Sequence, residues 1–450
     1  MKRFNLSGFV LCICIAASAQ NRNLVWCFGD SSGIDFNNIT TPVPIATGMD
    51  ARGSCCSIAD TSGNLLFYAS GSDLLQIPYS ESVIVRNNLN QILQNGDSLV
   101  GTAWYREHVI TDMPAISNQF YLFSVGVTNN YGFWYSVIDM SQNSGMGAVI
   151  QKNVQLLNFK CTDGMTAIKH GNGRDWWVLF RRWDTVNDNF YKYLVTPAGI
   201  SSLITQSIGS ATDNNNTRIQ FSHDGNKMVI INYRGLMEIF DFNRCTGIIS
   251  NPVTIHPEPT WPPYNEFTFC EFSPSGRFLY VTSYWDTCYL YQYDLLSPAP
   301  AATRITLDTI TNDLIGIGSL KLAPDGKIYL THAWECTAFP YCYPYPDSVY
   351  NTVNMYLSVI NYPDSLGSAC GYAPFSFYLG GKRTYYGLPN NPDYELPTLA
   401  GSPCDTLTGL TPGPSPKERG AELFATWVSS WQKLFVNAQN LKGKKVTVEV

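Results

Sequence analysis

FSHDGNKMVIINYRGLMEIFDF (221–242) and FSPSGRFLYVTSYWDTCYLYQYDL (272–295) share one layout: a tight turn, an apolar strand, a loop and a second strand. LAPDGKIYLTHAW (322–334) repeats the first half, and its second strand is delayed to MYLSVINY (355–362). Asp-Gly and Ser-Gly pairs suit these turns because glycine readily adopts the positive φ angle that a tight hairpin requires. The chain therefore contains a repeated unit of paired β-strands.

Three further stretches follow the same layout more loosely: IADTSGNLLFYASG from Ile58, AISNQFYLFSVG from Ala115 and KHGNGRDWWVLF from Lys169. The spacing of the turn residues is regular, with steps of 55, 55, 52, 51 and 50 residues between Gly63, Asn118, Gly173, Gly225, Gly276 and Gly326. A period near fifty with several short strands per unit is typical of a WD40-like β-propeller. The sequence predicts an all-β fold of this class.

A seventh blade is expected from the two ends of the repeat region. NRNLVWCFG at residues 21–29 resembles SGNLLFYASG at residues 62–71 and lies about one shortened period before it. We expect its partner strands near PFSFYLGG, residues 374–381, because strands from both ends would close the ring and remove exposed edges. Seven blades are favoured over six or eight, within a propeller covering residues 20–397.

Composition indicates an exported protein. Charged residues make up 14% of the chain, against about 25% in typical soluble domains. The net charge of −6 argues against a nucleic-acid partner, whose phosphates need a basic surface. Residues 1–19 have a basic start, an apolar run and Ala17-Ser18-Ala19, the pattern of a cleaved signal peptide. We expect no transmembrane segment beyond it.

The cysteines indicate disulfide chemistry more than metal binding. Eleven of the thirteen cysteines remain after the signal peptide, and Cys336 and Cys342 bracket a short loop that a disulfide could close. Cys27, Cys270 and Cys288 lie in apolar strand-like runs and are expected to be buried thiols. His332 with the loop cysteines could ligate zinc, but no CxxC accompanies them. No metal and no cofactor is predicted.

GDSSG at residues 29–33 matches the serine-hydrolase pattern G-x-S-x-G. A nucleophilic serine needs a strand that turns sharply into a helix. Here the motif follows the strand VWCF and leads into IDFNN, which has no helical pattern. Ser31 is therefore interpreted as part of a turn.

A ligand site is expected on one rim of the ring. In a propeller the turn joining the first two strands of a blade lies on one face, so the loop after the second strand emerges on the other. Those loops carry aromatic side chains, most with a neighbouring charge, which would suit a sugar or a peptide. The predicted ligand residues are Trp183, Asp184, Tyr233, Arg234, Tyr284, Trp285, Asp286, His332 and Trp334.

No catalytic constellation is specific enough to name a reaction. His108, His170 and His223 are expected to have structural roles, and no catalytic residue is predicted. Two functions remain open: a non-catalytic binding module for glycans or envelope proteins, and a glycan hydrolase or lyase acting in the central channel. The enzyme would need two carboxylates, or a histidine with a carboxylate, converging in the channel.

Several separated blocks are familiar: LVWCFGDSSGIDF, SCCSIADTSGNLLFYASG, MTAIKHGNGRDWWVL, LSVINYPDSLGSAC and YYGLPNNP. In this order they resemble the propeller-like N-terminal domain of secreted Bacteroidota proteins that are exported by the type IX secretion system and often named gliding-motility-associated. The resemblance spans residues 22–395. It implies a secreted or outer-membrane-surface location and the type IX machinery as a partner.

The C-terminal region differs in composition from the repeats. Residues 398–433 are interpreted as a linker and insertion, in which 418–432 is the one stretch beyond the signal peptide that could form a long helix. LFVNAQNLKGKKVTVEV, residues 434–450, resembles the start of a type IX C-terminal sorting domain. The usual later glycine-bearing turn is missing from this short, irregular tail.

Overall fold

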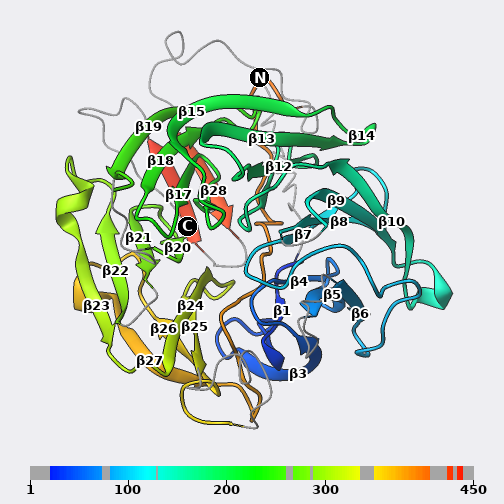
Figure 1. Cartoon of the computed structure of the whole chain (residues 1–450), viewed down its shortest axis with the longest axis horizontal. Helices are drawn as coiled ribbons and strands as arrows, with labels where there is room; N and C mark the ends of the chain where they lie inside the picture. The colour runs from blue at the N-terminus through cyan, green and yellow to red at the C-terminus, as the bar shows by residue number, and fades with distance from the viewer. Residues whose placement is uncertain are drawn as a thin grey trace, which may run out of the picture.

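The fold is a seven-bladed β-propeller, in which seven antiparallel sheets form a ring around a central axis (Figure 1). The computed structural model describes residues 21–72, 82–127, 130–259, 267–283, 287–334, 349–405, 423–428 and 433–438. The prediction of a seven-bladed propeller is confirmed. The predicted signal peptide, residues 1–19, lies outside the described residues.

The blades are numbered 1 to 7 in chain order. Blades 1 to 3 are the sheets β1(Val25–Phe28)-β2(Asp30–Asp35)-β3(Val43–Asp50), β4(Cys55–Ala59)-β5(Leu65–Ser72)-β6(Ser82–Asn87) and β7(His108–Asp112)-β8(Gln119–Gly126)-β9(Gly132–Asp139)-β10(Ala148–Leu157). Blade 4 is β11(Thr166–Lys169)-β12(Trp176–Arg181)-β13(Asn187–Thr196)-β14(Gly199–Ile200), and β15(Ile204–Thr212) also pairs with β13.

Blades 5 to 7 each have four strands. They are β16(Arg218–Phe221)-β17(Lys227–Ile231)-β18(Met237–Phe242)-β19(Ile249–His256), β20(Phe269–Phe272)-β21(Phe278–Thr282)-β22(Cys288–Asp294)-β23(Ile305–Ile310) and β24(Ile315–Leu322)-β25(Ile328–Trp334)-β26(Tyr356–Ile360)-β27(Tyr372–Tyr378). Helical structure in the described chain consists of the 3-10 turns η1(Asn143–Gly145), η2(Pro300–Thr303) and η3(Gly367–Cys370).

The repeated turns join the first two strands of each blade, as the sequence predicts. Gly225 lies between β16 and β17 with a φ of 71°, and Gly276 lies between β20 and β21 with a φ of 73°. A side chain is strained in this left-handed region, which explains the glycine at this point in five of the six repeats; the sixth has Asn118, with a φ of 62°.

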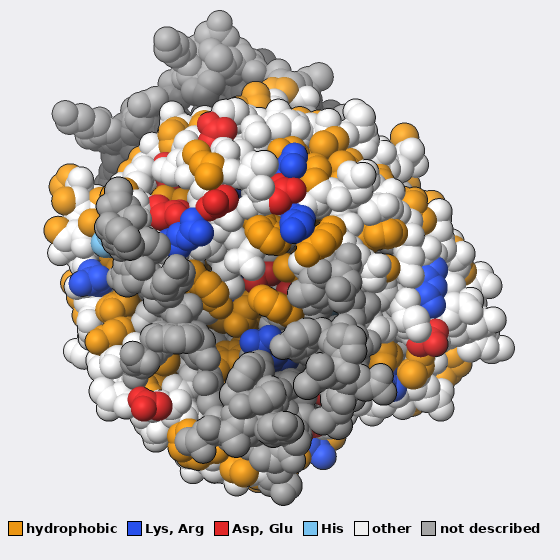
Figure 2. Space-filling model, viewed as in Figure 1, with side chains coloured by type: hydrophobic (Ala, Val, Ile, Leu, Met, Phe, Trp, Pro, Cys, Tyr) orange, Lys and Arg blue, Asp and Glu red, His pale blue; other side chains and the backbone are white. Residues whose placement is uncertain are grey.

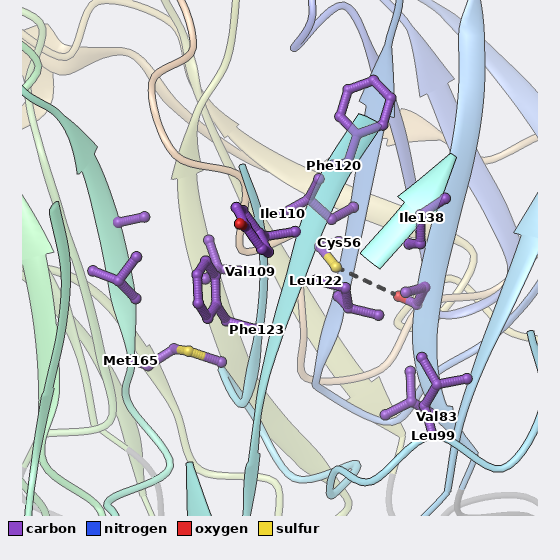
Figure 3. Packing of buried hydrophobic residues seen from close by; sticks show 14 of the residues in the cluster. Cys56, Val83, Leu99, Val109, Ile110, Phe120, Leu122, Phe123, Ile138 and Met165 are labelled. Carbon is purple, nitrogen blue, oxygen red and sulfur yellow. Dashed lines mark hydrogen bonds between the residues drawn. The ribbon is translucent and has the colours of Figure 1, made fainter. Parts of the chain in front are cut away.

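Apolar side chains fill the spaces between neighbouring blades. In Figure 3, Leu122 lies on the side of Cys56 from blade 2, whereas Val109 and Phe123 lie on the side of Met165, which precedes β11. Successive residues of a strand point to opposite faces, so each blade packs against both of its neighbours. Cys27, Cys270 and Cys288 are buried, as expected for them.

The ring closes differently from the prediction. PFSFYLGG, expected to complete the blade that begins at residue 21, instead supplies β27, the last strand of the blade 7 sheet. An alternating apolar pattern predicts a strand but does not specify its partner, and here the partner is β26, the preceding strand in the chain. The expectation for this segment was wrong.

Residues 384–391, which follow β27 in the chain, occupy the position nearest the central axis in blade 1. Strand β1 lies antiparallel to β4, since Ala51 N donates to Gly29 O and Ala59 N donates to Arg22 O, both at 2.9 Å. The bridge between Arg106 and Gly164, just before the first strands of blades 3 and 4, is parallel.

Residues 384–391 run in that parallel sense beside β4. Tyr386 N donates to Arg52 O at 3.0 Å, and Asn390 N donates to Cys55 O at 2.8 Å. Both ends of the repeat region therefore close the ring, although the C-terminal contribution is irregular chain and not a strand.

Residues 382–405, called the strap below, continue across the middle of the ring toward blade 4 (orange in Figure 1). The Tyr394 hydroxyl donates to Ile110 O at 2.9 Å, and Arg244 Nη2 donates to Pro397 O at 2.8 Å. A disulfide joins Cys245 and Cys404, whose Cα atoms lie 5.5 Å apart. Packing against the propeller thus extends beyond residue 397, where the sequence placed its end.

Beyond the strap, β28(Leu423–Val428) and β29(Lys433–Ala438) form an antiparallel pair. The first of these strands lies within 418–432, the stretch named above as able to form a helix, so that expectation was wrong. The predicted disulfide partners Cys336 and Cys342 lie outside the described residues.

Candidate functional site

Trp183 and Asp184, two predicted ligand residues, lie in the loop after β12. Lys160 Nζ is 4.9 Å from the Trp183 ring centroid and 4.5 Å from the Tyr131 ring centroid. Asp184 Oδ2 accepts a hydrogen bond from Arg182 Nη2 at 3.2 Å. Tyr131, Lys160, Arg182, Trp183 and Asp184 are called the rim cluster below. Its charges and rings already contact one another.

Tyr233 and Arg234, in the loop between β17 and β18, are also engaged. The Tyr233 hydroxyl is 3.2 Å from the Tyr105 hydroxyl. Arg234 Nη1 lies 2.5 Å from Asp213 Oδ1 and 3.1 Å from Glu258 Oε1. On the face shown in Figure 2, several Lys and Arg side chains in the upper half likewise lie beside Asp and Glu side chains.

Of the remaining predicted rim residues, the structure describes His332 and Trp334. His332 is fully buried at 0% exposure, with its ring centroid 4.6 Å from that of Phe375. Burial lowers the pKa of His332 to about 3, so it is neutral. The expectation that it lies exposed on the rim was wrong. Trp334, the last residue of β25, is partly buried. Tyr284, Trp285 and Asp286 lie outside the described residues.

The central channel contains a cavity of about 100 Å³ at the end beside the strap. Its walls are the first strands of blades 4 to 7, the turns after β16 and β24, and strap residues 389–396. A single water needs about 10 to 15 Å³ of such volume. The cavity, called the channel cavity below, therefore has room for a small polar molecule.

Three polar side chains of the channel cavity occupy equivalent places in their blades. Gln220, Glu271 and Lys321 each lie five residues before the turn glycine, at positions 225, 276 and 326. Each is the second-last residue of the first strand of its blade. The sequence analysis did not identify them. A polar or charged residue at a fixed distance before the turn is the signal that could have.

A chain of hydrogen bonds links Gln220 and Glu271 to Arg106, which lies just before blade 3, whereas Lys321 bonds to the strap. Arg106 Nη1 donates to Gln220 Oε1 at 2.5 Å, and Gln220 Nε2 donates to Glu271 Oε1 at 2.9 Å. Lys321 Nζ donates to Asn391 O of the strap at 2.9 Å. Burial raises the pKa of Glu271 and lowers that of Lys321 to about 8, although each charge partly offsets the shift of the other.

His223 and Asp393 form an ion pair where the strap passes the turn of blade 5. His223 Nδ1 lies 2.7 Å from Asp393 Oδ2, and the side chains are 20% and 25% exposed. Burial lowers the pKa of His223, but the charge and hydrogen bond of Asp393, together with the charges of Asp224 and Glu395, raise it overall. Burial would raise the pKa of Asp393, which His223 instead holds below its usual value. This is the histidine–carboxylate pair that the enzyme alternative required.

A second buried cluster of charges lies next to Arg106, whose backbone N donates to Asp163 O at 3.2 Å. The Arg218 side chain packs between the rings of Tyr105 and Phe269, each 4.5 Å from its guanidinium carbon, and Nη2 is 3.9 Å from Asp163 Oδ2. Burial raises the pKa of Asp163 and of the neighbouring Glu107. Glu107 accepts from Trp104 N and Tyr105 N, which holds the preceding turn.

The short hydrolase motif does not form a nucleophile site. Ser31 has a φ of 61° and its hydroxyl donates to Asp30 Oδ1 at 3.2 Å, directly after the Gly29 turn between β1 and β2. Ser31 is the second residue of β2, so the motif continues as a strand and not as a helix. The described part of the chain contains no group of three or more His, Cys, Asp or Glu side chains arranged to hold a metal ion.

Comparisons with known proteins identify similar folds only. No protein-family model matches the chain, and no curated protein is similar to it. A putative 6-phosphogluconolactonase from Bacteroides fragilis NCTC 9343 is 12% identical over 81% of this chain and 96% of its own, with a TM-score of 0.48. Hsv2 from Kluyveromyces lactis is 11% identical over 77% of this chain and 92% of its own, with a TM-score of 0.37. In the described chain, no helix has the length and apolar character of a membrane span.

Proposed function

We propose that this protein is an exported, non-catalytic binding module that holds a glycan in the channel cavity. The observation that carries the proposal is a polar cavity of about 100 Å³ with donors and acceptors from four blades and the strap. Ligand sites are concave and combine an enclosed shape with a few convergent polar groups. Sugar hydroxyls both donate and accept, so a wall containing amides, carboxylates and cations suits them.

The rim cluster supports the proposal less well. Lys160 and the Trp183 ring contact each other, and Arg182 and Asp184 are hydrogen-bonded. A ligand at the rim cluster would have to replace contacts that already exist, whereas the channel cavity offers a volume that no side chain fills. Export remains part of the proposal on the strength of residues 1–19 and of the family resemblance, with the type IX machinery as the export partner and the cell surface or medium as the location.

A glycan hydrolase or lyase remains the second candidate, because the His223–Asp393 pair lies in the cavity wall. A histidine held by a carboxylate can accept a proton, and Lys321, with a pKa of about 8, can donate one. The pair also joins the strap to blade 5, and that structural role alone explains its geometry.

The test uses the full chain, purified under oxidising conditions. A glycan array detects binding, and product analysis of each bound glycan after prolonged incubation detects turnover. We expect binding without turnover, and a substantial loss of binding in Lys321→Met with the wild-type melting temperature retained. Turnover that His223→Gln abolishes would establish the enzyme instead. Absence of binding to every glycan would contradict both.

A further inference from the structure

Arg106 and Lys321 line the part of the channel cavity called the inner end below. Most N–H groups of these two cations have no hydrogen-bond acceptor among the described residues. Arg106 is 6% exposed, and among the described residues its side chain hydrogen-bonds only to Gln220. Within the part of the chain that the structure describes, Lys321 Nζ donates only to Asn391 O, and it lies 5.6 Å from the Trp26 ring centroid. A buried donor without an acceptor is costly, so such groups are normally satisfied by water or by a ligand.

The carboxylate already present does not neutralise both cations. Glu271 Oε1 accepts from Gln220 Nε2 and from Phe272 N, and Glu271 Oε2 accepts from Leu322 N. Neither Arg106 nor Lys321 forms an ion pair with it within the described part of the chain. Two cations and one anion leave the inner end with one net positive charge.

The side of the cavity formed by His223, Asp393 and Glu395 carries an excess of negative charge, because two carboxylates face one imidazole. His223 and Asp393 are opposite charges 2.7 Å apart and largely cancel. Glu395 lies in the same wall, further along the strap. A ligand in the cavity therefore meets a negative side at Asp393 and Glu395 and a positive side at Arg106 and Lys321.

We propose that the inner end of the channel cavity binds the carboxylate of an acidic sugar, with Arg106 and Lys321 as its partners. This rests on the proposed glycan-binding function and adds the class of sugar. Arginine presents parallel N–H groups that match a carboxylate, and lysine supplies a further charged donor. A phosphate dianion would leave an excess negative charge beside Glu271, so a monoanion fits the local balance better.

Isothermal titration calorimetry of the full chain tests this directly. The probes are D-glucuronate and D-galacturonate, their neutral counterparts D-glucose and D-galactose, and inorganic phosphate. Since a charged pair contributes about 1.5 to 3 kcal/mol, we expect each uronate to bind at least tenfold more tightly than its neutral sugar and than phosphate. The matched variants are Lys321→Met, Arg106→Gln and the control Arg174→Gln, which lies on a blade 4 turn outside the cavity and pairs with Asp175.

We expect Lys321→Met and Arg106→Gln each to lose at least tenfold in uronate affinity, and the control to match wild type. Lys321→Met decides the result if Arg106→Gln fails to fold. Equal binding of uronate and neutral sugar, or unchanged uronate affinity in a folded Lys321→Met, would overturn the carboxylate site and leave glycan binding standing. Tighter binding of phosphate would also overturn it. Absence of binding to any sugar, here and on the array, would remove the proposed function as well.

Discussion

The rim cluster and the channel cavity both combine cations with aromatic rings, and they differ in what those groups contact. Lys160 lies against two rings and Arg182 bonds to Asp184, all within the rim cluster. In the channel cavity, Arg106 and Lys321 each make one hydrogen bond among the described residues and face open volume. A ligand site is therefore better recognised by hydrogen-bond donors that lack an acceptor and line a cavity than by the number of aromatic rings.

The largest effect should come from removing the strap residue that anchors the cavity wall. Tyr394 is fully buried, donates to Ile110 O and lies edge-on to Trp176, with ring centroids 5.7 Å apart. Truncating a large buried aromatic side chain costs about 3 to 5 kcal/mol, so Tyr394→Ala should lower the free energy of unfolding by about that amount. Urea denaturation measures it.

Tyr362→Ala is the control, because Tyr362 is 67% exposed. If Tyr394→Ala were as stable as this control, the strap would not belong to the folded propeller, and the channel cavity would lose one of its walls.

The next largest effect concerns the disulfide between blade 5 and the strap. Cys245 and Cys404 are 159 residues apart in the chain, and a disulfide closing a long loop stabilises by about 2 to 4 kcal/mol. Cys404→Ser should therefore lower the melting temperature and make it insensitive to reductant. Calorimetry with and without dithiothreitol checks this, since the reduced wild type should melt close to the variant. Equal melting of oxidised wild type and variant would contradict it.

A smaller effect is expected at the rim, where a substitution should lower the stability of the fold and leave the uronate affinity unchanged. Trp183→Ala removes the ring beside Lys160 and should cost about 1 kcal/mol, the usual magnitude of a cation–aromatic contact. Its uronate affinity should stay within twofold of wild type. Calorimetric titration beside Lys321→Met checks this. A tenfold affinity loss in Trp183→Ala with unchanged stability would place the ligand on the rim instead.

The smallest effect concerns pH and the His223–Asp393 pair. The raised pKa of His223 adds stability that is present below about pH 6.5 and is lost as pH rises through its folded value. The lowered pKa of Asp393 adds stability that is present above about pH 3.8 and is lost as pH falls through its folded value. The pair therefore stabilises most between about pH 4 and pH 6.5.

His223→Gln should lose about 1 kcal/mol in that window, a modest amount because the pair is partly exposed. Melting temperatures of wild type and variant should converge toward pH 9. A constant difference across the range would assign the effect to packing.

The repeats predicted the fold because each turn needs a glycine or a similar residue at one place, and five steps of 50 to 55 residues are compatible with few architectures. The closing segment was missed for a physical reason. YYGLPNNPDYELP, residues 385–397, has no strand periodicity, since its prolines and asparagines favour irregular chain. Its position depends on contacts with Arg52, Cys55 and Ile110, which are distant in the sequence.

The channel cavity could be predicted only in part. His223 was noted as a turn residue, but its partner Asp393 is 170 positions away and no local pattern joins them. Glu271 and Lys321 each stand alone in an apolar strand and meet only because the ring brings first strands together. Local sequence placed Trp183 in a loop correctly, yet it could not reveal the contact with Lys160.

Hydrogen–deuterium exchange with and without saturating D-galacturonate decides whether the ligand binds in the channel cavity or at the rim, because one measurement reports on both regions. We expect slower exchange at residues 321–324 and 389–396, which contribute to the cavity wall, and unchanged exchange at residues 182–187 and 232–236. Protection confined to residues 182–187 and 232–236, with the strap unchanged, would contradict it.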